Sequence, residues 1–175
     1  MKKISSVFLA LFLLSSVSFA QFEVGKHHAG PAVGLSFLGS TLSLGANYEY
    51  GMSLKDIGVD APGTLGIGGI FRYWSYDTGY WSYTDIVIAA QGNYHFKLDN
   101  NKIDPYLGLV IGYDIGSWDW DGPYDYDWDD SYGGFIFGGS AGCRYWFSPS
   151  MALNARLGTG SNFGSTLDLG LDFKF

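Results

Sequence analysis

The chain has 175 residues, of which 47% are hydrophobic, 18% aromatic and only 15% charged, and its formal net charge is −7. Soluble domains ordinarily carry about 25% charged residues, so this composition is unusual for one, and it is too apolar for a disordered chain. The chain has only 10 Lys and Arg against 17 Asp and Glu. This balance argues against a nucleic-acid partner, because binding phosphates needs clustered positive charge. The single cysteine, Cys143, excludes an internal disulfide and a cysteine-based zinc site.

The first 20 residues have the three parts of a secretory signal peptide. Lys2 and Lys3 precede an apolar run, Val7 to Leu14, which is followed by the small residues of Ser15 to Ala20. The run is too short for a membrane-spanning helix, which needs about 20 apolar residues. We therefore predict cleavage before Gln21, which leaves one folded domain over 21–175.

From residue 33 onward, apolar and polar residues alternate with the period of two that β-strands have. In the final segment, Leu167, Leu169 and Leu171 share one face, while Asp168 and Asp172 lie on the other. The segments with this pattern are 33–37, 42–50, 65–73, 86–96, 107–115, 135–147, 153–157 and 167–175. The longest connection between them is 117–132, and no helical period occurs after residue 20.

The chemistry of the two faces decides between a soluble and a membrane barrel. One face is almost wholly Leu, Ile, Val, Ala, Phe and Tyr, and the other carries Gly, Ser, Asn, Gln and most strand charges. An eight-stranded barrel encloses too little room for the bulky apolar face, whereas glycines and a few polar side chains fit inside. Aromatic residues near both ends of the segments agree with interfacial girdles. We predict an all-β fold, an eight-stranded antiparallel up-and-down transmembrane β-barrel.

These features resemble the small outer-membrane β-barrels of diderm bacteria, the outer membrane protein A-like and W-like barrels. The resemblance rests on the signal peptide, the eight alternating segments and the ending Leu167 to Phe175, together with Val33-Gly-Leu35 and Arg144 to Pro149. It implies that 21–175 is an outer-membrane barrel in contact with lipid. It also implies that the final strand, closed by Phe175, is read by the outer-membrane assembly machinery.

Charged residues enclosed by a barrel must pair or remain hydrated. The predicted interior polar network consists of Glu49, Arg72, Asp85, His95, Asp114, Arg144, Arg156, Asp168 and Asp172. Hairpin register places Arg156 opposite Asp168, and Arg72 one diagonal from Asp85. Four members should gather near the periplasmic end: Glu49, His95, Arg144 and Asp172. A packed salt-bridge plug is favoured over a gate or a proton-sensitive constriction, because interiors of this size are normally filled by side chains.

The connection 117–132 is the only plausible interaction site, and the resemblance puts it outside the cell. Its candidate residues are Trp118, Asp119, Trp120, Asp121, Tyr124, Asp125, Tyr126, Asp127, Trp128, Asp129 and Asp130. The carboxylates could hold Ca²⁺, although the spacing does not match an EF-hand, and the rings could stack on sugars or a protein partner. The alternative is a solvated acidic loop whose rings enter the lipid headgroups.

No hydrolase, metalloprotease, phosphate-binding or dinucleotide-binding motif is present, so the sequence predicts neither an enzyme nor a cofactor. We expect an integral outer-membrane barrel with a filled interior and a structural or surface-interaction role through the outer loop. A narrow transport path for small hydrophobic solutes is the first alternative, which the W-like resemblance allows. A soluble periplasmic lipocalin-like binder is the second. The extracellular ligand or partner is not specified by the sequence.

Overall fold

The computed structural model describes residues 21–36, 41–123, 131–161 and 164–175, so the predicted signal peptide lies outside the described chain. The strands are β1 (His27–Ser36), β2 (Thr41–Ser53), β3 (Thr64–Thr78), β4 (Trp81–His95), β5 (Ile103–Trp120), β6 (Ser131–Ser148), β7 (Met151–Gly160) and β8 (Gly164–Lys174). A short 3-10 helix, η1 (Leu54–Ile57), follows β2. Within these residues, no helix is long and apolar enough to span a bilayer.

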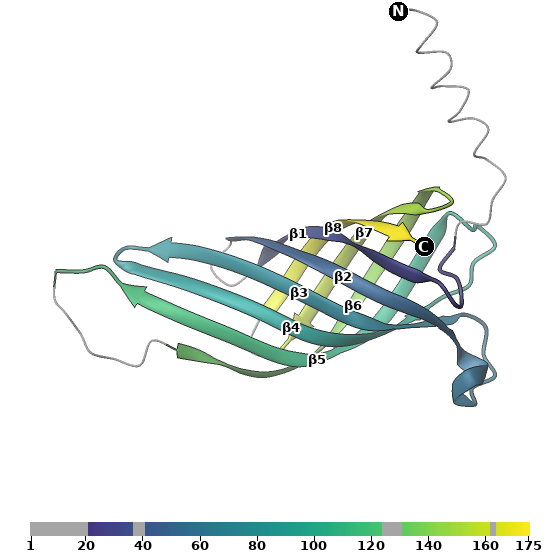
Figure 1. The fold of residues 1–175 in the computed structure, drawn as a ribbon, viewed down its shortest axis with the longest axis horizontal. Coiled ribbons are helices and arrows are strands. Elements are labelled where there is room, and N and C mark those ends of the chain that lie inside the picture. Colours follow the sequence, from purple (N-terminus) through teal and green to yellow (C-terminus); the bar gives the residue numbers. More distant parts are fainter. Residues whose placement is uncertain (1–20, 37–40, 124–130, 162–163) are drawn as a thin grey trace, which may run out of the picture.

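Each strand pairs antiparallel with the next one in sequence, and β1 also pairs with β8, so that the sheet closes into a barrel (Figure 1). At the closure the backbone amides of His27 and Phe175 donate to each other's carbonyl oxygens, at 2.9 and 3.0 Å. The predicted eight-stranded up-and-down barrel is therefore confirmed. Below, the end where β1 begins and β8 ends is called the terminal end, and the opposite end the distal end.

Most strands extend beyond the segments expected from alternation, and β1 and β5 show why. β1 begins at His27 rather than near residue 33, because Gly30 and Pro31 interrupt the alternation but still pair with Asn47 and Ala46 of β2. β5 continues to Trp120, into the segment expected to be a loop. Together with the β3–β4 hairpin, the distal part of β5 projects well past the other strands (Figure 1).

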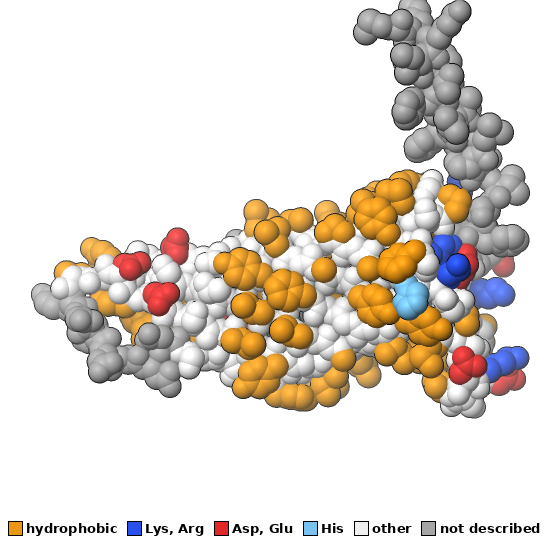
Figure 2. All heavy atoms as spheres, in the orientation of Figure 1, with side chains coloured by type: hydrophobic (Ala, Val, Ile, Leu, Met, Phe, Trp, Pro, Cys, Tyr) orange, Lys and Arg blue, Asp and Glu red, His pale blue; other side chains and the backbone are white. Residues whose placement is uncertain are grey.

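The two faces of the barrel are distributed as predicted. Leu109 and Leu169 are 62% and 65% exposed on the outer wall, whereas Asp168 and Asp172 are buried inside. Exposed apolar side chains from all eight strands form a belt on the outer wall, and on the face shown in Figure 2 the charged side chains lie beyond it at the two ends. Aromatic residues border the belt: Tyr48, Tyr50, Phe96, Tyr145 and Phe173 toward the terminal end, and Tyr73, Tyr113 and Phe135 toward the distal end.

Cys143 is exposed on this outer wall, between Ala141 and Tyr145 of β6. Because lipid would cover it, we expect a charged, membrane-impermeant maleimide to label the protein in vesicles much more slowly than an uncharged maleimide does. Labelling by the two reagents, followed by mass spectrometry, checks this, with urea-unfolded protein as the control that reacts with both. Rapid labelling by the charged reagent in folded protein would show that the outer wall faces water.

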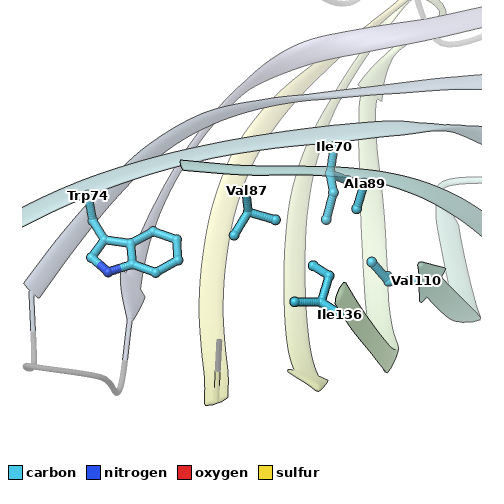
Figure 3. Close-up of a cluster of buried hydrophobic side chains, with 6 residues drawn as sticks. All are labelled: Ile70, Trp74, Val87, Ala89, Val110 and Ile136. Atoms are coloured by element: carbon cyan, nitrogen blue, oxygen red, sulfur yellow. The ribbon is translucent and has the colours of Figure 1, made fainter. Parts of the chain in front are cut away.

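The interior is not wholly polar, so the predicted salt-bridge plug accounts for only part of its filling. Buried apolar side chains of β3, β4, β5 and β6 form one cluster inside the barrel: Ile70, Trp74, Val87, Ala89, Val110 and Ile136 (Figure 3). The alternating pattern concealed this cluster because its members occupy inward positions among glycines and polar residues. The interior therefore has an apolar layer in addition to its charged groups.

Candidate functional site

The largest charged group inside the barrel is centred on Arg144 of β6, which lies at the terminal end. Its guanidinium donates to Glu49 and Asp172, each at 2.5 Å, and a third carboxylate, that of Asp104, lies 3.6 Å away. The ring of Tyr106 packs against the guanidinium, 5.1 Å from ring centroid to Cζ. All five side chains are almost fully buried, so this cation is held by charge-assisted hydrogen bonds in a site shielded from water.

His95 of β4 links two of these carboxylates. Its Nε2 lies 3.0 Å from Glu49 Oε2, and its Nδ1 lies 2.9 Å from Asp104 Oδ1. Asp104 is not among the predicted interior residues, because it precedes the alternating segment 107–115. The available signal was its alternation in phase with Tyr106 and Gly108, two inward positions of β5.

Phe22 closes the terminal end of the barrel over this cluster. Its ring stacks on His95 with centroids 3.7 Å apart and on His28 with centroids 4.1 Å apart, and only 5% of the residue is exposed. Beside it is a cavity of about 290 Å³ whose wall includes Gln21, His95 and Asp104. Residues before β1 therefore contribute to the filling of the lumen, which strand alternation could not reveal.

A second ion pair joins β3 to β8 across two intervening strands. Asp168 Oδ2 accepts from Nη2 and Nε of Arg72, at 2.8 and 3.2 Å. The pair has room because a side chain on Gly34 of β1 would meet Asp168 at 2.2 Å, and one on Gly45 of β2 would meet Arg72 at 2.7 Å. Glycines at the inward positions of β1 and β2 thus allow a contact between strands that are not neighbours.

This contact corrects one expected pairing and qualifies another. Arg72 does lie one diagonal from Asp85, which is opposite Trp74, but it pairs with Asp168 instead. Arg156 does lie opposite Asp168 in the β7–β8 register, yet its Nη1 is 3.8 Å from the carboxylate. The strand register correctly predicts which residues are neighbours. Which carboxylate each arginine binds depends on how far its long side chain reaches across the lumen.

The partner of Asp168 can be tested by double-mutant cycles. We expect a coupling energy of about 1–3 kcal/mol between Arg72→Ala and Asp168→Ala, and less than about 1 kcal/mol between Arg156→Ala and Asp168→Ala. The difference follows from the 2.8 Å and 3.8 Å contacts of the two arginines. Urea unfolding of each single and double variant in lipid vesicles supplies the free energies. A larger coupling for Arg156 would contradict the observed pairing.

Inward glycines also make room for the Arg144 cluster. A Cβ at Gly142 of β6 would lie 2.3 Å from the ring of Tyr106, which donates from its hydroxyl to Asn154 at 2.9 Å. We expect Gly142→Ala to destabilise the barrel by about 1–3 kcal/mol, because the ring must move within a packed interior. Gly92→Ala is the matched control, since a Cβ there would meet nothing within 4 Å. Equal unfolding midpoints for the two variants would show that the Tyr106 ring is not confined.

Two further carboxylates lie inside the distal end. Asp85 of β4 and Asp114 of β5 are 4% and 3% exposed, and each is diagonal to the other because Asp114 lies opposite Val87. Asp85 accepts a hydrogen bond from the Tyr132 hydroxyl at 2.7 Å, whereas Asp114 Oδ1 has no hydrogen-bond partner among the described residues. No arginine or lysine of the described chain forms an ion pair with either of them.

The outer-loop candidates fall into two groups. Trp118, Asp119 and Trp120 belong to β5, which corrects their assignment to a loop, and Asp121 follows directly, its amide donating to the carbonyl of Tyr80 at 2.8 Å. The other seven candidates lie outside the described residues: Tyr124, Asp125, Tyr126, Asp127, Trp128, Asp129 and Asp130.

The polarity of the wall reverses where β3, β4 and β5 project past the barrel. The outward side continues beyond Tyr73, Ile86 and Ile115 with polar residues only: Ser75, Asp77, Ser82, Thr84, Ser117 and Asp119. The inward side becomes aromatic and carries Tyr76, Trp81, Tyr83, Trp118 and Trp120. The Trp81 ring lies 4.8 Å from that of Trp118 and 4.6 Å from that of Trp120. This set of inward rings is called the distal aromatic face below.

The described sites offer ion pairs and aromatic rings for binding. No group of three or more His, Cys, Asp or Glu side chains in the described part of the chain has a geometry that could hold a metal ion. Phe175, the expected assembly signal, is 65% exposed on the outer wall, and its ring stacks against His27 with centroids 5.8 Å apart.

Comparison with known proteins rests on the fold. No protein-family model matches the chain, and no curated protein matches its sequence. The N-terminal β-barrel domain of Pseudomonas aeruginosa OprF superposes with a TM-score of 0.60 at 14% identity, covering 87% of this chain and 98% of that one. OprG from Pseudomonas aeruginosa gives 0.58 at 12% identity, covering 90% and 99%. Neisserial surface protein A gives 0.53 at 20% identity, covering 86% and 95%. The chain thus has the fold of the small eight-stranded outer-membrane β-barrels.

Proposed function

We propose that the protein is an integral protein of the bacterial outer membrane that has a closed interior and a structural or surface-interaction role through its distal end. The terminal end then faces the periplasm and the distal end the cell exterior. The proposal includes export by a signal peptide over 1–20, contact of the apolar belt with outer-membrane lipid, and recognition of the final strand, which ends at Phe175, by the assembly machinery.

The observation that carries this proposal is the filling of the lumen in successive layers. Phe22 and the Arg144 cluster occupy the terminal end, and the Arg72–Asp168 pair and the apolar cluster around Ile136 follow toward the distal end. Eight-stranded barrels enclose just enough room for side chains, and here ion pairs and apolar contacts occupy it. A filled lumen supports a role at the surface over a role in transport.

The orientation is supported by the lengths of the strands. The β3–β4 hairpin and β5 project past the barrel at the distal end, so the longest hairpins lie there. Barrels of the outer-membrane type have short periplasmic turns and longer extracellular loops. An epitope tag in the distal Gly79–Tyr80 turn should therefore bind antibody on intact cells, whereas a tag at Gly58–Val59 should bind it only after the outer membrane is permeabilised. Surface labelling of the second tag alone would overturn the orientation.

The closed lumen is tested by electrical recording. Purified protein in planar lipid bilayers should give no stepwise current under conditions in which a large porin conducts, because described side chains from Phe22 to Ile136 occupy the interior. Migration that differs between boiled and unboiled samples confirms that the recorded protein is folded. Reproducible current steps, or flux of a small apolar solute into vesicles, would overturn the closed interior and favour the narrow transport path instead.

A further inference from the structure

The basic residues of the chain are unevenly distributed along the barrel, whereas acidic residues lie at both ends. Every lysine of residues 21–175 lies at the terminal end, in or beside its connections: Lys26, Lys55, Lys97, Lys102 and Lys174. The stretches 73–96 and 103–143, which supply the distal parts of β3, β4, β5 and β6, contain no Lys or Arg. In Figure 2 the basic side chains accordingly gather at one end, and only acidic ones mark the other.

The distal end thus has negative charge that the protein itself does not neutralise. Asp77 and Asp119 are exposed on the outward side of the projecting strands. Asp114 is buried with Oδ1 unpartnered in the described chain, and the neighbouring Asp85 accepts a hydrogen bond from the neutral hydroxyl of Tyr132 and forms no ion pair with a described Lys or Arg. A buried carboxylate without a partner is costly, so this arrangement favours a positively charged group supplied from outside.

The distal aromatic face lies directly beyond these two carboxylates. Tyr76, whose ring stacks on Tyr83 with centroids 4.9 Å apart, also packs against the buried apolar cluster, and Trp81 lies further out. Tyr80, in the adjoining turn, is 58% exposed and contacts Trp120 edge to face at 5.5 Å. Ring faces attract ammonium and guanidinium groups, and most strongly where neighbouring carboxylates add to the attraction.

We propose that the distal end binds a basic polypeptide segment, whose Lys or Arg side chains lie against the distal aromatic face and neutralise Asp85 and Asp114. This proposal rests on the surface-interaction role proposed above and names the chemistry of the partner. A Lys or Arg side chain combines an apolar stem with a charged head, which matches rings placed beside carboxylates. Calcium matches less well, because it takes six to eight oxygen ligands and the described residues offer two carboxylates surrounded by rings.

The test uses the full-length barrel in nanodiscs of uncharged lipid, with fluorescent octalysine as the probe. Octaglutamate and a Gly-Ser octapeptide are the comparison peptides, and calcium alone is titrated separately by calorimetry. We expect Asp85→Asn combined with Asp114→Asn to weaken octalysine binding about tenfold, because two carboxylates facing the cation are lost. The matched control, Asp56→Asn combined with Asp60→Asn, removes the same charge from the terminal end and should change binding by less than about twofold.

Two further variants separate binding from folding and ring contacts from net charge. Asp77→Asn combined with Asp119→Asn alters only exposed residues, and we expect it to weaken binding while leaving heat-modifiable migration unchanged. Trp81→Ser should still weaken the residual binding at about 0.5 M salt, where long-range attraction between exposed charges is screened.

Three results would overturn the proposal: equal loss of binding in the terminal-end control, no loss in either distal variant, or octalysine binding that requires calcium. If octalysine fails to bind and the planar bilayers carry no current, the proposed basic partner is wrong, but the proposed closed barrel with a surface role is unaffected. If the bilayers conduct, the proposed function fails whatever the peptides do.

Discussion

Replacing Arg144 with methionine is expected to reduce the free energy of unfolding by about 3–5 kcal/mol, because it leaves buried carboxylates without their cation. Glu49 and Asp172 each lie 2.5 Å from the guanidinium, and neither is exposed by more than 2%. Methionine keeps much of the length of the side chain, so the loss reports the missing charge more than a missing volume. Tryptophan fluorescence during urea unfolding in lipid vesicles measures it.

Two further variants show whether the loss comes from the buried ion pairs. Lys55→Met removes an exposed cation that lies 3.8 Å from Asp60, and it should change stability by less than about 0.5 kcal/mol. Adding Glu49→Gln and Asp172→Asn to Arg144→Met should recover most of the loss, since the two carboxylates hydrogen-bonded to the guanidinium are then neutral. A single variant as stable as the Lys55 control would mean that the cluster is hydrated rather than packed.

Trp74→Ala is expected to cost about 3–5 kcal/mol, because it leaves a cavity in a closed interior. Trp74 is 1% exposed and belongs to the apolar cluster with Val87 and Ile136 (Figure 3). The surrounding strands are held by continuous hydrogen-bonded ladders on both sides, so the wall cannot collapse into the space. Unfolding in lipid vesicles gives the loss.

The control for this variant is another large aromatic residue of the same region. Tyr80→Ala truncates an exposed ring in the β3–β4 turn and should stay within about 0.5 kcal/mol of the wild type. Trp74→Phe should lie between the two, because it keeps part of the packing. If Trp74→Ala and Tyr80→Ala were equally stable, the apolar cluster would contribute nothing to the interior.

The barrel and its two faces were predictable because alternation is a local property of the sequence. The segment ending at Phe175 shows its leucines and aspartates in the same order as they face outward and inward in the structure. Where strands pair without alternation, the sequence predicts a strand that is too short. Gly30 and Pro31 interrupt the alternation, so the first half of β1 was not predicted. The polarity reversal beyond Tyr73 and Ile115 likewise made the end of β5 resemble a loop.

The sequence predicted which charged residues lie inside the barrel better than it predicted which of them contact each other. Hairpin register follows from turn length, so the opposition of Arg156 and Asp168 could be derived from the sequence. The contact of Arg72 with Asp168 joins β3 to β8, and it depends on how strands separated in sequence approach across the lumen. Phe22 lies before the first strand, and nothing in its neighbourhood indicates that its ring enters the barrel.

The seam between β1 and β8 has a consequence for how the protein is made. The first strand obtains its second neighbour only from the last one, so translation must reach Lys174 before the ring of hydrogen bonds can close. Until then the sheet has two open edges, which would pair with other chains. Under the proposed outer-membrane location, closure of the barrel therefore follows export, and a chain truncated before β8 should aggregate rather than form a smaller barrel.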